Sequence, residues 1–458
     1  MTLRFYNSLT NQKEDFRPIH EGEVSMYVCG MTVYDSCHLG HARAMMAFDI
    51  LVRYLKNQDY KVKFVRNITD VDDKIIERAI QNNESIGDLT QRTIASMQED
   101  FAQLGLLLPN TEPRATDYIP GMIEMIEGLI QKGHAYHSPG GDVFFAVRTF
   151  PEYGKLSNKN IDDLNPGSRV AEDESKKDPL DFVLWKSAKE GEPSWNSPWG
   201  KGRPGWHIEC SVMSFENLGQ HFDIHGGGPD LLFPHHENEI AQSECSSGHK
   251  FANYWLHSGL LKINGEKMSK SLGNFAMLKD LFISYHPEVL RYYLISSHYR
   301  SSLNFDQESL NQARSALTRL YQALASVQVD GNDLDLDQDM IDKFSLVMDD
   351  DLNTPEALSV LFQLAKLINS SSNTEKKIKY ASTLKELSGV LGLLQDDPKI
   401  FFQFGATLSD EEIDQQISLR NEARDTKNFE TADKIRDSLL DQGIILDDSS
   451  EGTTWKKS

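Results

Sequence analysis

The stretch FPHHENEIAQSEC, residues 233–245, places two histidines and two glutamates within five positions, followed by a cysteine. If the stretch is helical, His235 and Glu239 are one turn apart and share a face. Imidazole and carboxylate groups both bind zinc, so this pair could supply half of a metal site. A polar helix with solvated side chains would explain the same residues. The stretch alone leaves both interpretations open.

A second motif, HLGH at residues 38–41, follows a predicted strand and begins a predicted helix. The free N–H groups and the dipole at a helix N-terminus favour an anion. His38 and His41 could therefore hydrogen-bond phosphate oxygens, and Gly40 has no Cβ to keep a ligand from the backbone. Alternatively, one histidine caps the helix and the other is exposed.

A third motif, KMSKS at residues 267–271, lies between Gly265 and Gly273. Lys267 and Lys270 on such a loop could move onto a polyphosphate and neutralise charge that develops in the transition state. A solvated lysine loop is the alternative. The occurrence of this motif downstream of HLGH favours phosphate chemistry.

The elements that must position these motifs read as an α/β fold. Residues 24–29 and 61–66 are predicted strands, with an amphipathic helix between them. Such a crossover implies a parallel sheet, in which ligands bind beyond the C-terminal ends of the strands. Another strand, running through a glycine loop into a helix, is predicted at HFDIHGGGPDLLF, residues 221–233. From Leu310 onward, helical stripes of apolar residues predict a bundle.

The composition limits the classes of protein that need to be considered. A formal charge of −22 over 458 residues argues against a nonspecific nucleic-acid coat protein, which needs an excess of lysine and arginine. No apolar run is long enough for a membrane span, and the N-terminal residues lack the pattern of a secretion signal, so we expect no membrane association and a cytoplasmic location. The four cysteines form no CxxC pair, and in the cytosol disulfides are rare.

Taken together, the motif-bearing blocks resemble one family. YVCGMTVYDSCHLGHAR, NITDVDDK, GRPGWHIECS, FDIHGGGPDLLFPHHENEIAQSE and GEKMSKSLGN occur in this order. They resemble cysteinyl-tRNA synthetases of the compact bacterial type, which are class I aminoacyl-tRNA synthetases, and the resemblance extends to the closing GTTW. Leu39 stands where the family pattern has isoleucine, a residue of similar volume, so this difference should matter little.

The resemblance implies a zinc ion held by two cysteines, a histidine and a glutamate, which match Cys29, Cys210, His235 and Glu239. The HExxH zinc motif does not fit, because position 240 is isoleucine. Shape alone typically separates near-isosteres by only about 10- to 200-fold. A direct bond from zinc to the substrate thiolate would select cysteine over serine chemically. We expect the Glu239 ligand bond to lengthen or break when cysteine binds.

The resemblance also implies the reaction: L-cysteine and ATP form cysteinyl-adenylate and pyrophosphate, and cysteine then passes to the 3′ end of tRNA(Cys). Mg²⁺ would arrive with ATP, and the chain would be a monomer. The catalytic residues implied are His38, His41, Lys267 and Lys270. ATP would contact Gly40, Gly227, Gly228, Asp230 and Lys270, and the amino acid would contact Cys29, Gly30, Thr32, Thr69, Trp206 and His225. Candidates for reading the anticodon are Asn428, Arg436 and Trp455.

The implied domain organisation is a Rossmann-like parallel-sheet catalytic domain, interrupted by an insertion and followed by helical domains. The two catalytic halves are 1–111 and 206–250, separated by a connective domain at 112–205. A stem-contact region with KMSKS (251–308), a helical bundle that binds tRNA (309–400) and a small anticodon-binding domain (401–458) follow.

Two other functions are compatible with parts of the sequence. A ligase that transfers activated cysteine to an amino-sugar would share the catalytic half, but such relatives lack an anticodon domain. A non-catalytic zinc- and RNA-binding module would not need both histidines and both lysines of the phosphate motifs.

Overall fold

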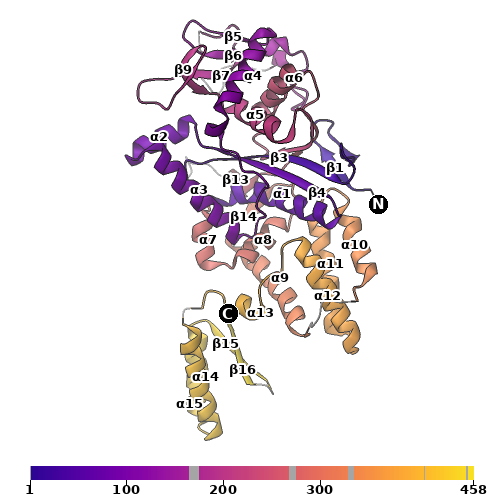
Figure 1. Ribbon diagram of the computed structural model, residues 1–458. Coiled ribbons are helices and arrows are strands. Elements are labelled where there is room, and N and C mark those ends of the chain that lie inside the picture. The colour runs from indigo at the N-terminus through magenta and orange to yellow at the C-terminus, as the bar shows by residue number, and fades with distance from the viewer. Residues whose placement is uncertain are drawn as a thin grey trace. The chain divides into compact units, whose positions relative to one another are not determined.

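The computed structural model describes residues 2–163, 175–267, 275–328, 335–406, 408–449 and 452–457 (Figure 1). The chain divides into two compact units. The first comprises Met1–Phe275, Ser297–Asn304 and Ser345–Thr354. The second comprises Ala276–Ser296, Phe305–Phe344 and Pro355–Ser458. Among the described helices, none has the length and apolar character needed to cross a membrane.

A four-stranded sheet of order β11-β10-β3-β4 forms the centre of the first unit, and all its pairings are parallel. Its strands are β3 (Glu23–Thr32), β4 (Lys61–Thr69), β10 (Phe222–Gly227) and β11 (Ala252–His257). The parallel α/β fold class expected from the strand–helix–strand pattern is therefore confirmed. Most residues of these strands are buried, including polar ones such as Asn67 and His225, as expected for a parallel sheet that is covered on both faces.

Strand β3 extends beyond its predicted end, because it pairs again with β4 after an irregularity. The register shifts between Val28 and Met31, and pairing then resumes between Met31 and Ile68. Cys29 therefore lies inside the strand, at a bulge, and not at its end as the sequence suggested. A bulge turns side chains away from the strict alternation of a strand.

Glycine is required at the next position of this bulge. A Cβ built on Gly30 would lie 1.8 Å from the carbonyl oxygen of Asn67 on β4, which is closer than any side chain could approach. The two backbones can only come this close because residue 30 has no side chain.

Helix α1 (Leu39–Asn57) connects β3 to β4 and contacts the sheet. His38 is its N-cap, so the predicted helix start at HLGH is confirmed. The predicted apolar stripe is buried, and its members are Met45, Phe48, Leu51, Val52 and Leu55.

Helices α5 (Trp206–Leu218) and α6 (Glu237–Ser247) pack against each other and carry the remaining metal-ligand candidates. A single wide helical turn, Leu232–His236, precedes α6. Phe233 has extended dihedral angles, so the helix expected to run through 233–245 begins only after it. His235 and Glu239 nevertheless remain one turn apart.

A five-stranded antiparallel sheet of order β5-β6-β7-β9-β8 lies in the chain between the two sequence halves of the parallel sheet. Its strands are β5 (Ala135–His137), β6 (Val143–Phe145), β7 (Phe182–Ser187), β8 (Trp195–Ser197) and β9 (Gly200–Pro204). One continuous apolar cluster includes residues of this sheet, of α4 and α5, and of the parallel sheet. The other elements with residues in this unit are β1 (Arg4–Asn7), β2 (Gln12–Asp15), α2 (Asp73–Asn82), α3 (Ile86–Gln103), α4 (Ile119–Gln131), β12 (Leu261–Ile263), β13 (Glu266–Lys267) and three short 3₁₀ turns; β14 (Leu303–Phe305) pairs with β12.

The second unit is helical, as the apolar stripes predicted, and it ends in a small α/β element with its own core. Its helices include α7 (Leu278–Ser284), α8 (Pro287–Ile295), α9 (Gln307–Ala325), α11 (Thr354–Ser370), α12 (Thr374–Val390) and α13 (Pro398–Gln403), and α10 (Gln338–Met348) begins in it. The terminal element consists of α14 (Asp410–Asp425), α15 (Phe429–Asp441), β15 (Ile444–Ser449) and β16 (Gly452–Lys457). The predicted capping box of Ser409 and Glu412 begins α14.

Candidate metal centre and ligand pocket

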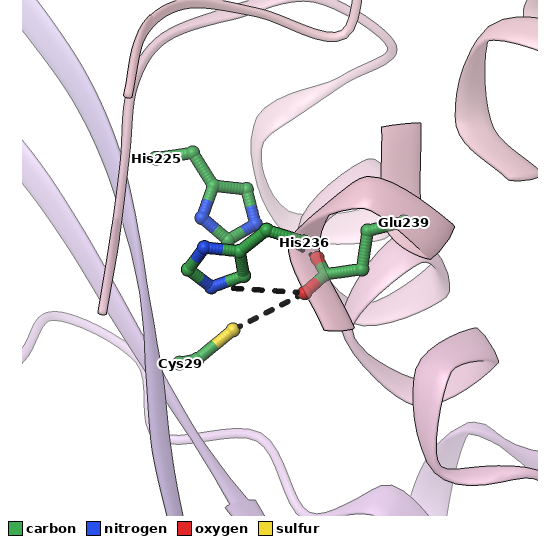
Figure 2. A group of neighbouring side chains, drawn as sticks. All are labelled: Cys29, His225, His236 and Glu239. Atoms are coloured by element: carbon green, nitrogen blue, oxygen red, sulfur yellow. Dashed lines mark hydrogen bonds and ion pairs between the residues drawn. The ribbon is translucent and has the colours of Figure 1, made fainter. Parts of the chain in front are cut away.

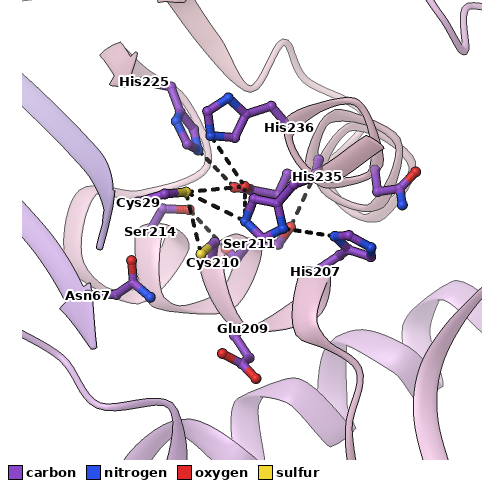
Figure 3. Close-up of polar contacts among 12 residues, drawn as sticks. Cys29, Asn67, His207, Glu209, Cys210, Ser211, Ser214, His225, His235 and His236 are labelled. Atoms are coloured by element: carbon purple, nitrogen blue, oxygen red, sulfur yellow. Dashed lines mark hydrogen bonds and ion pairs between the residues drawn. The ribbon is translucent and has the colours of Figure 1, made fainter. Parts of the chain in front are cut away.

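Two overlapping groups of buried donor atoms lie against the parallel sheet, which contributes Cys29 from β3 and His225 from β10. One consists of Cys29, His225, His236 and Glu239 (Figure 2), and the other of Cys29, Cys210, His235 and Glu239 (Figure 3). In each group the donor atoms all lie within 4.8 Å of one another. The groups share Cys29 and Glu239, so they cannot hold two ions with four separate ligands each.

The second group, which we call the four-donor cluster, has the separations of a tetrahedral zinc site. The Cys29 sulfur lies 3.6 Å from the Cys210 sulfur, 3.6 Å from His235 Nε2 and 3.4 Å from Glu239 Oε1. Zinc bonds of ~2.0–2.3 Å in a tetrahedron place ligand atoms roughly 3.3–3.8 Å apart. The His235 Nε2 to Glu239 Oε1 distance, 2.9 Å, is shorter, as expected when a hydrogen bond joins these two atoms. The donor set and its spacing fit zinc.

The first group fits zinc less well. One nitrogen of each of its histidines already has a hydrogen-bond partner, Glu239 within the group and His257 outside it. His225 Nε2 lies 2.8 Å from the outer oxygen of Glu239, and His236 Nδ1 lies 2.8 Å from His257 Nε2. His236 Nε2 is 4.0 Å from Glu239 Oε1 (Figure 2). The first group also offers one sulfur instead of two, and thiolate ligands favour zinc over harder cations.

The protonation of the four-donor cluster reflects burial and mutual contact. Burial, together with the neighbouring Cys210, raises the pKa of the Cys29 thiol well above its ordinary value. Burial also acts to raise the pKa of Cys210, but hydrogen bonds from Cys29 and His235 outweigh it and lower that pKa to about 6. Burial acts to lower the pKa of His235, yet Glu239 and Cys210 raise it to about 10. For Glu239, His225 and His235 overcome burial and hold the pKa well below its ordinary value.

Outside the cluster, a second layer of aromatic and imidazole rings fixes the ligands. His207 Nδ1 lies 2.8 Å from His235 Nδ1, which leaves His235 Nε2 facing the sulfurs (Figure 3). The Trp206 ring lies 4.1 Å from the His235 ring, between centroids. His225 stacks on Trp255 with centroids 4.3 Å apart.

Two residues of this second layer, His207 and His257, were not predicted from the sequence. His207 sits inside the block GRPGWHIECS, directly after Trp206, and that position was its only signal. His257 bonds His236 and also Ser8 Oγ, at 2.8 Å each, and comes from a strand with no motif. His236 is fully buried, so the interpretation of residues 233–245 as a helix with solvated side chains does not hold for this histidine.

A cavity of about 330 Å³ opens next to the cluster within the first unit. Its lining contains most of the residues predicted for the ATP and amino-acid sites, namely Cys29, Gly30, Thr32, His38, Gly40, His41, Trp206, Gly228 and Asp230. Thr69 and His225 are buried and do not line the cavity, and Gly227 ends β10 directly before the lining residue Gly228. Lys267 lies in β13. Lys270 and the rest of KMSKS lie outside the described residues.

The two histidines of HLGH cap α1 reciprocally and also line the cavity. The His41 backbone N–H donates to His38 Nδ1 at 3.3 Å, and the His38 backbone N–H donates to His41 Nδ1 at 3.5 Å. The rings stack with centroids 3.5 Å apart. Burial and His38 hold the pKa of His41 well below its usual value, so this ring is neutral. Because Nδ1 accepts in the cap, the ring proton is on Nε2, where it could be donated to a phosphate oxygen.

Cys37 and Cys245, the two cysteines without a ligand role, lie outside both donor groups. Cys37 is buried with its sulfur 3.6 Å from Met31 Sδ, and Cys245 is half-buried against the core.

The three anticodon candidates lie in the C-terminal element in different environments. Asn428 caps α15 through the Thr431 N–H. Arg436 is exposed and pairs with Asp433 and Asp437. Trp455 is 7% exposed and packs with Ile413 and Leu439, which gives it a core role.

Comparison with known proteins agrees with this geometry. Residues 15–315 match the model of the class I (C) tRNA synthetase catalytic domain, and residues 343–395 match the DALR domain. A protein named Cysteine–tRNA ligase from Methylococcus capsulatus is 56% identical over 99% of this chain and all of its own length. One of the same name from Legionella pneumophila (strain Corby) is 56% identical over 99% of both chains.

Solved structures of other synthetases share the fold at low sequence identity. A Mycobacterium tuberculosis methionyl-tRNA synthetase with methionyl-adenylate is 14% identical, with a TM-score of 0.57 over 81% of this chain and 89% of its own. A leucyl-tRNA synthetase from Agrobacterium radiobacter is 12% identical, with a TM-score of 0.58 over 82% of this chain and 84% of its own. On the identity and coverage of its curated relatives, the chain belongs to the cysteine–tRNA ligase family of class I tRNA synthetases.

Proposed function

We propose that this chain activates L-cysteine with ATP and transfers it to the 3′ end of tRNA(Cys), and that the four-donor cluster selects the substrate by its thiol. Family membership supports the ligase reaction. One observation supports selection of the substrate by its thiol: four buried donor atoms lie within 4.8 Å of one another, beside a cavity that residues of HLGH also line.

Cys29, Cys210, His235 and Glu239 would hold one zinc ion. When bound, zinc would supply a direct bond to the substrate sulfur, which a serine hydroxyl makes poorly because of its far higher pKa. The chain's own residues orient this centre. His207 fixes the His235 ring, and His225 fixes the Glu239 carboxylate through its second oxygen.

At the other end of the cavity, His38 and His41 would donate to the ATP phosphates through Nε2, with Gly40 admitting the ligand to the helix N-terminus. Lys267 and Lys270 would neutralise the charge on the departing pyrophosphate, with Mg²⁺ arriving on ATP. No residue of the chain needs to act as a nucleophile, because the cysteine carboxylate attacks the α-phosphate itself. Positioning therefore supplies most of the catalysis.

Between these ends, Gly227, Gly228 and Asp230 would receive the adenosine, with the Asp230 carboxylate on the ribose hydroxyls. Gly30, Thr32 and Trp206 would surround the cysteine, with Thr69 and His225 supporting them from behind. The predicted domain boundaries remain part of this proposal, with 309–400 and 401–458 binding tRNA. We also propose a monomer located in the cytoplasm.

The C-terminal element favours this function over transfer to an amino-sugar. The described residues between 408 and 457 form helices α14 and α15 and the paired strands β15 and β16, with a core of their own, which a small acceptor molecule would not require. A non-catalytic module would not require the two reciprocally capped, half-buried imidazoles of HLGH that line the cavity.

Replacing a sulfur ligand tests the proposed function. Cys210→Ser should abolish stoichiometric zinc and lower cysteine-dependent ATP–pyrophosphate exchange at least about 100-fold, because hydroxyl is a poor ligand. Cys245→Ser, which changes a thiol outside the cluster, is the matched control and should keep both. Zinc content, exchange and subsequent tRNA charging are the measurements. Full exchange in the Cys210→Ser protein, or exchange without tRNA charging in the unaltered protein, contradicts the proposal.

The imidazole of His38 can be separated from its capping role. His38→Asn keeps a good N-cap side chain but removes Nε2. We expect the exchange rate to fall about 100-fold, with little change in the thermal transition, because only the phosphate contact is lost. The exposed His249→Asn change serves as control. An exchange rate within threefold of that of the unaltered protein would show that His38 only caps the helix and does not contribute to the reaction.

Metal binding should release protons. At pH 7.5, Cys29 with its raised pKa and His235 with a pKa of about 10 are protonated, whereas Cys210 with a pKa of about 6 and Glu239 are ionised. Binding zinc to the metal-free protein should therefore release about two protons per ion, because all four ligands must be deprotonated. The number of protons released should rise towards three below pH 6, where Cys210 is also protonated, and fall towards one above pH 10, where His235 has already lost its proton. Calorimetry in buffers of different ionisation enthalpy measures it, and release of no proton at pH 7.5 contradicts this assignment.

A further inference from the structure

We propose that Glu209 is a positioning residue that holds the two sulfur-bearing segments of the metal centre together through a hydrogen-bond chain to Gly30. The chain runs from Glu209 through Thr69 and Asn67. This inference rests on the proposed metal centre and adds a role for residues that are not ligands.

The chain of contacts is continuous and has one direction. The Gly30 N–H donates to Asn67 Oδ1 at 2.8 Å, and Asn67 Nδ2 donates to Thr69 Oγ1 at 3.4 Å. The Thr69 hydroxyl then donates to Glu209 Oε2 at 3.0 Å. The Gly30 N–H and Asn67 Nδ2 can only donate, so Thr69 Oγ1 accepts from Asn67 and its own proton is left for Glu209 Oε2.

One end of this chain is the bulge that positions Cys29. Gly30 lies between Val28 and Met31, where the pairing of β3 with β4 shifts. At this point the Gly30 N–H donates to the side chain of Asn67 and not to a backbone carbonyl. A free bulge could relax toward regular pairing, which would turn the Cys29 side chain away from the cluster.

The other end is the first turn of α5, next to the second sulfur. Glu209 immediately precedes Cys210, and the sulfur of Cys210 lies 3.6 Å from that of Cys29. The chain and the sulfur pair therefore close a loop between β3, β4 and α5. Figure 3 draws Asn67 and Glu209 beside the ligands that they would support.

The burial of Glu209 argues against a purely packing role. Its side chain is 1% exposed, and its Oε1 has no hydrogen-bond partner among the described residues. Burying a carboxyl group with one oxygen unsatisfied is costly. An apolar residue would pack in α5 without this cost, so we assign the group to the centre that it adjoins.

The test measures the metal and not only the reaction. Thr69→Val, in the full-length protein, keeps the volume of the side chain but removes the hydroxyl that links Asn67 to Glu209. The zinc dissociation constant, from competition with a chelator, should rise about tenfold or more, in the range seen for outer partners of metal ligands. The Co²⁺-substituted protein should also show shifted d–d absorption bands. Thr69→Ser restores the hydroxyl and should bring zinc affinity to within about threefold of the unaltered protein.

Thr90→Val is the matched control. It also removes a buried threonine hydroxyl, which donates to the carbonyl of Ile86 within α3, away from the cluster. Its zinc affinity should stay within about threefold. Equal weakening by both valine variants, or unchanged affinity in Thr69→Val, overturns the positioning role.

If the Thr69→Val protein does not fold, a second pair of variants tests the same inference. Glu209→Gln keeps an acceptor for Thr69, whereas Glu209→Ala removes it. The glutamine variant should bind zinc about tenfold more tightly than the alanine variant, and equal affinities overturn the inference. If the unaltered protein binds no zinc, the proposed function is overturned. If the unaltered protein binds zinc but the variants bind it equally well, only the positioning role of Glu209 is overturned.

Discussion

Two sulfurs, an imidazole and a carboxylate lie buried within a few ångströms of one another. Burying an isolated thiolate or carboxylate is strongly unfavourable, and placing two anions a few ångströms apart adds repulsion. The contacts within the metal-free cluster offset this only partly, since they leave Cys29 as a thiol and His235 as an imidazolium. A divalent cation at the centre would offset the negative charge and satisfy all four donors at once.

The surrounding fold can be understood as the means of bringing these donors together. Cys29 comes from a bulge in β3, Cys210 from the first turns of α5, and His235 and Glu239 from the turn that starts α6. Each location is a departure from regular structure or the start of a helix, where side chains can converge. Specific residues stabilise these departures. Gly30 lets two backbones approach closely, and Asn67 accepts a hydrogen bond from the bulge. His207 and His225 each contact one ligand from outside the cluster. The cavity then extends from the sulfurs to the N-terminus of α1, where an anion is favoured.

Much of this arrangement could be predicted from the sequence, for identifiable reasons. The parallel sheet and α1 follow from apolar runs and three- to four-residue periodicity, which are local signals. The four ligands were named through resemblance to a family, and the structure brings them together. Local reasoning supplied only the spacing of His235 and Glu239, and even there the helix was predicted to begin too early, because Phe233 is extended.

Other features depend on contacts between distant segments. Nothing near Cys29 indicates that β3 continues past it, since the continuation depends on pairing with Ile68 and Thr69. His207 and His257 carry no motif and acquire their roles only when α5 and β11 reach the centre. Glu209 reads as an ordinary first-turn acid of a helix until Thr69 is placed beside it.

If the buried cluster holds a cation that bonds the substrate sulfur, X-ray absorption at the zinc edge will detect the added ligand. We expect two sulfur ligands at roughly 2.3 Å without substrate, three with saturating cysteine, and two with serine. A sulfur count that stays the same when cysteine is added would show that the substrate thiol does not bind the metal.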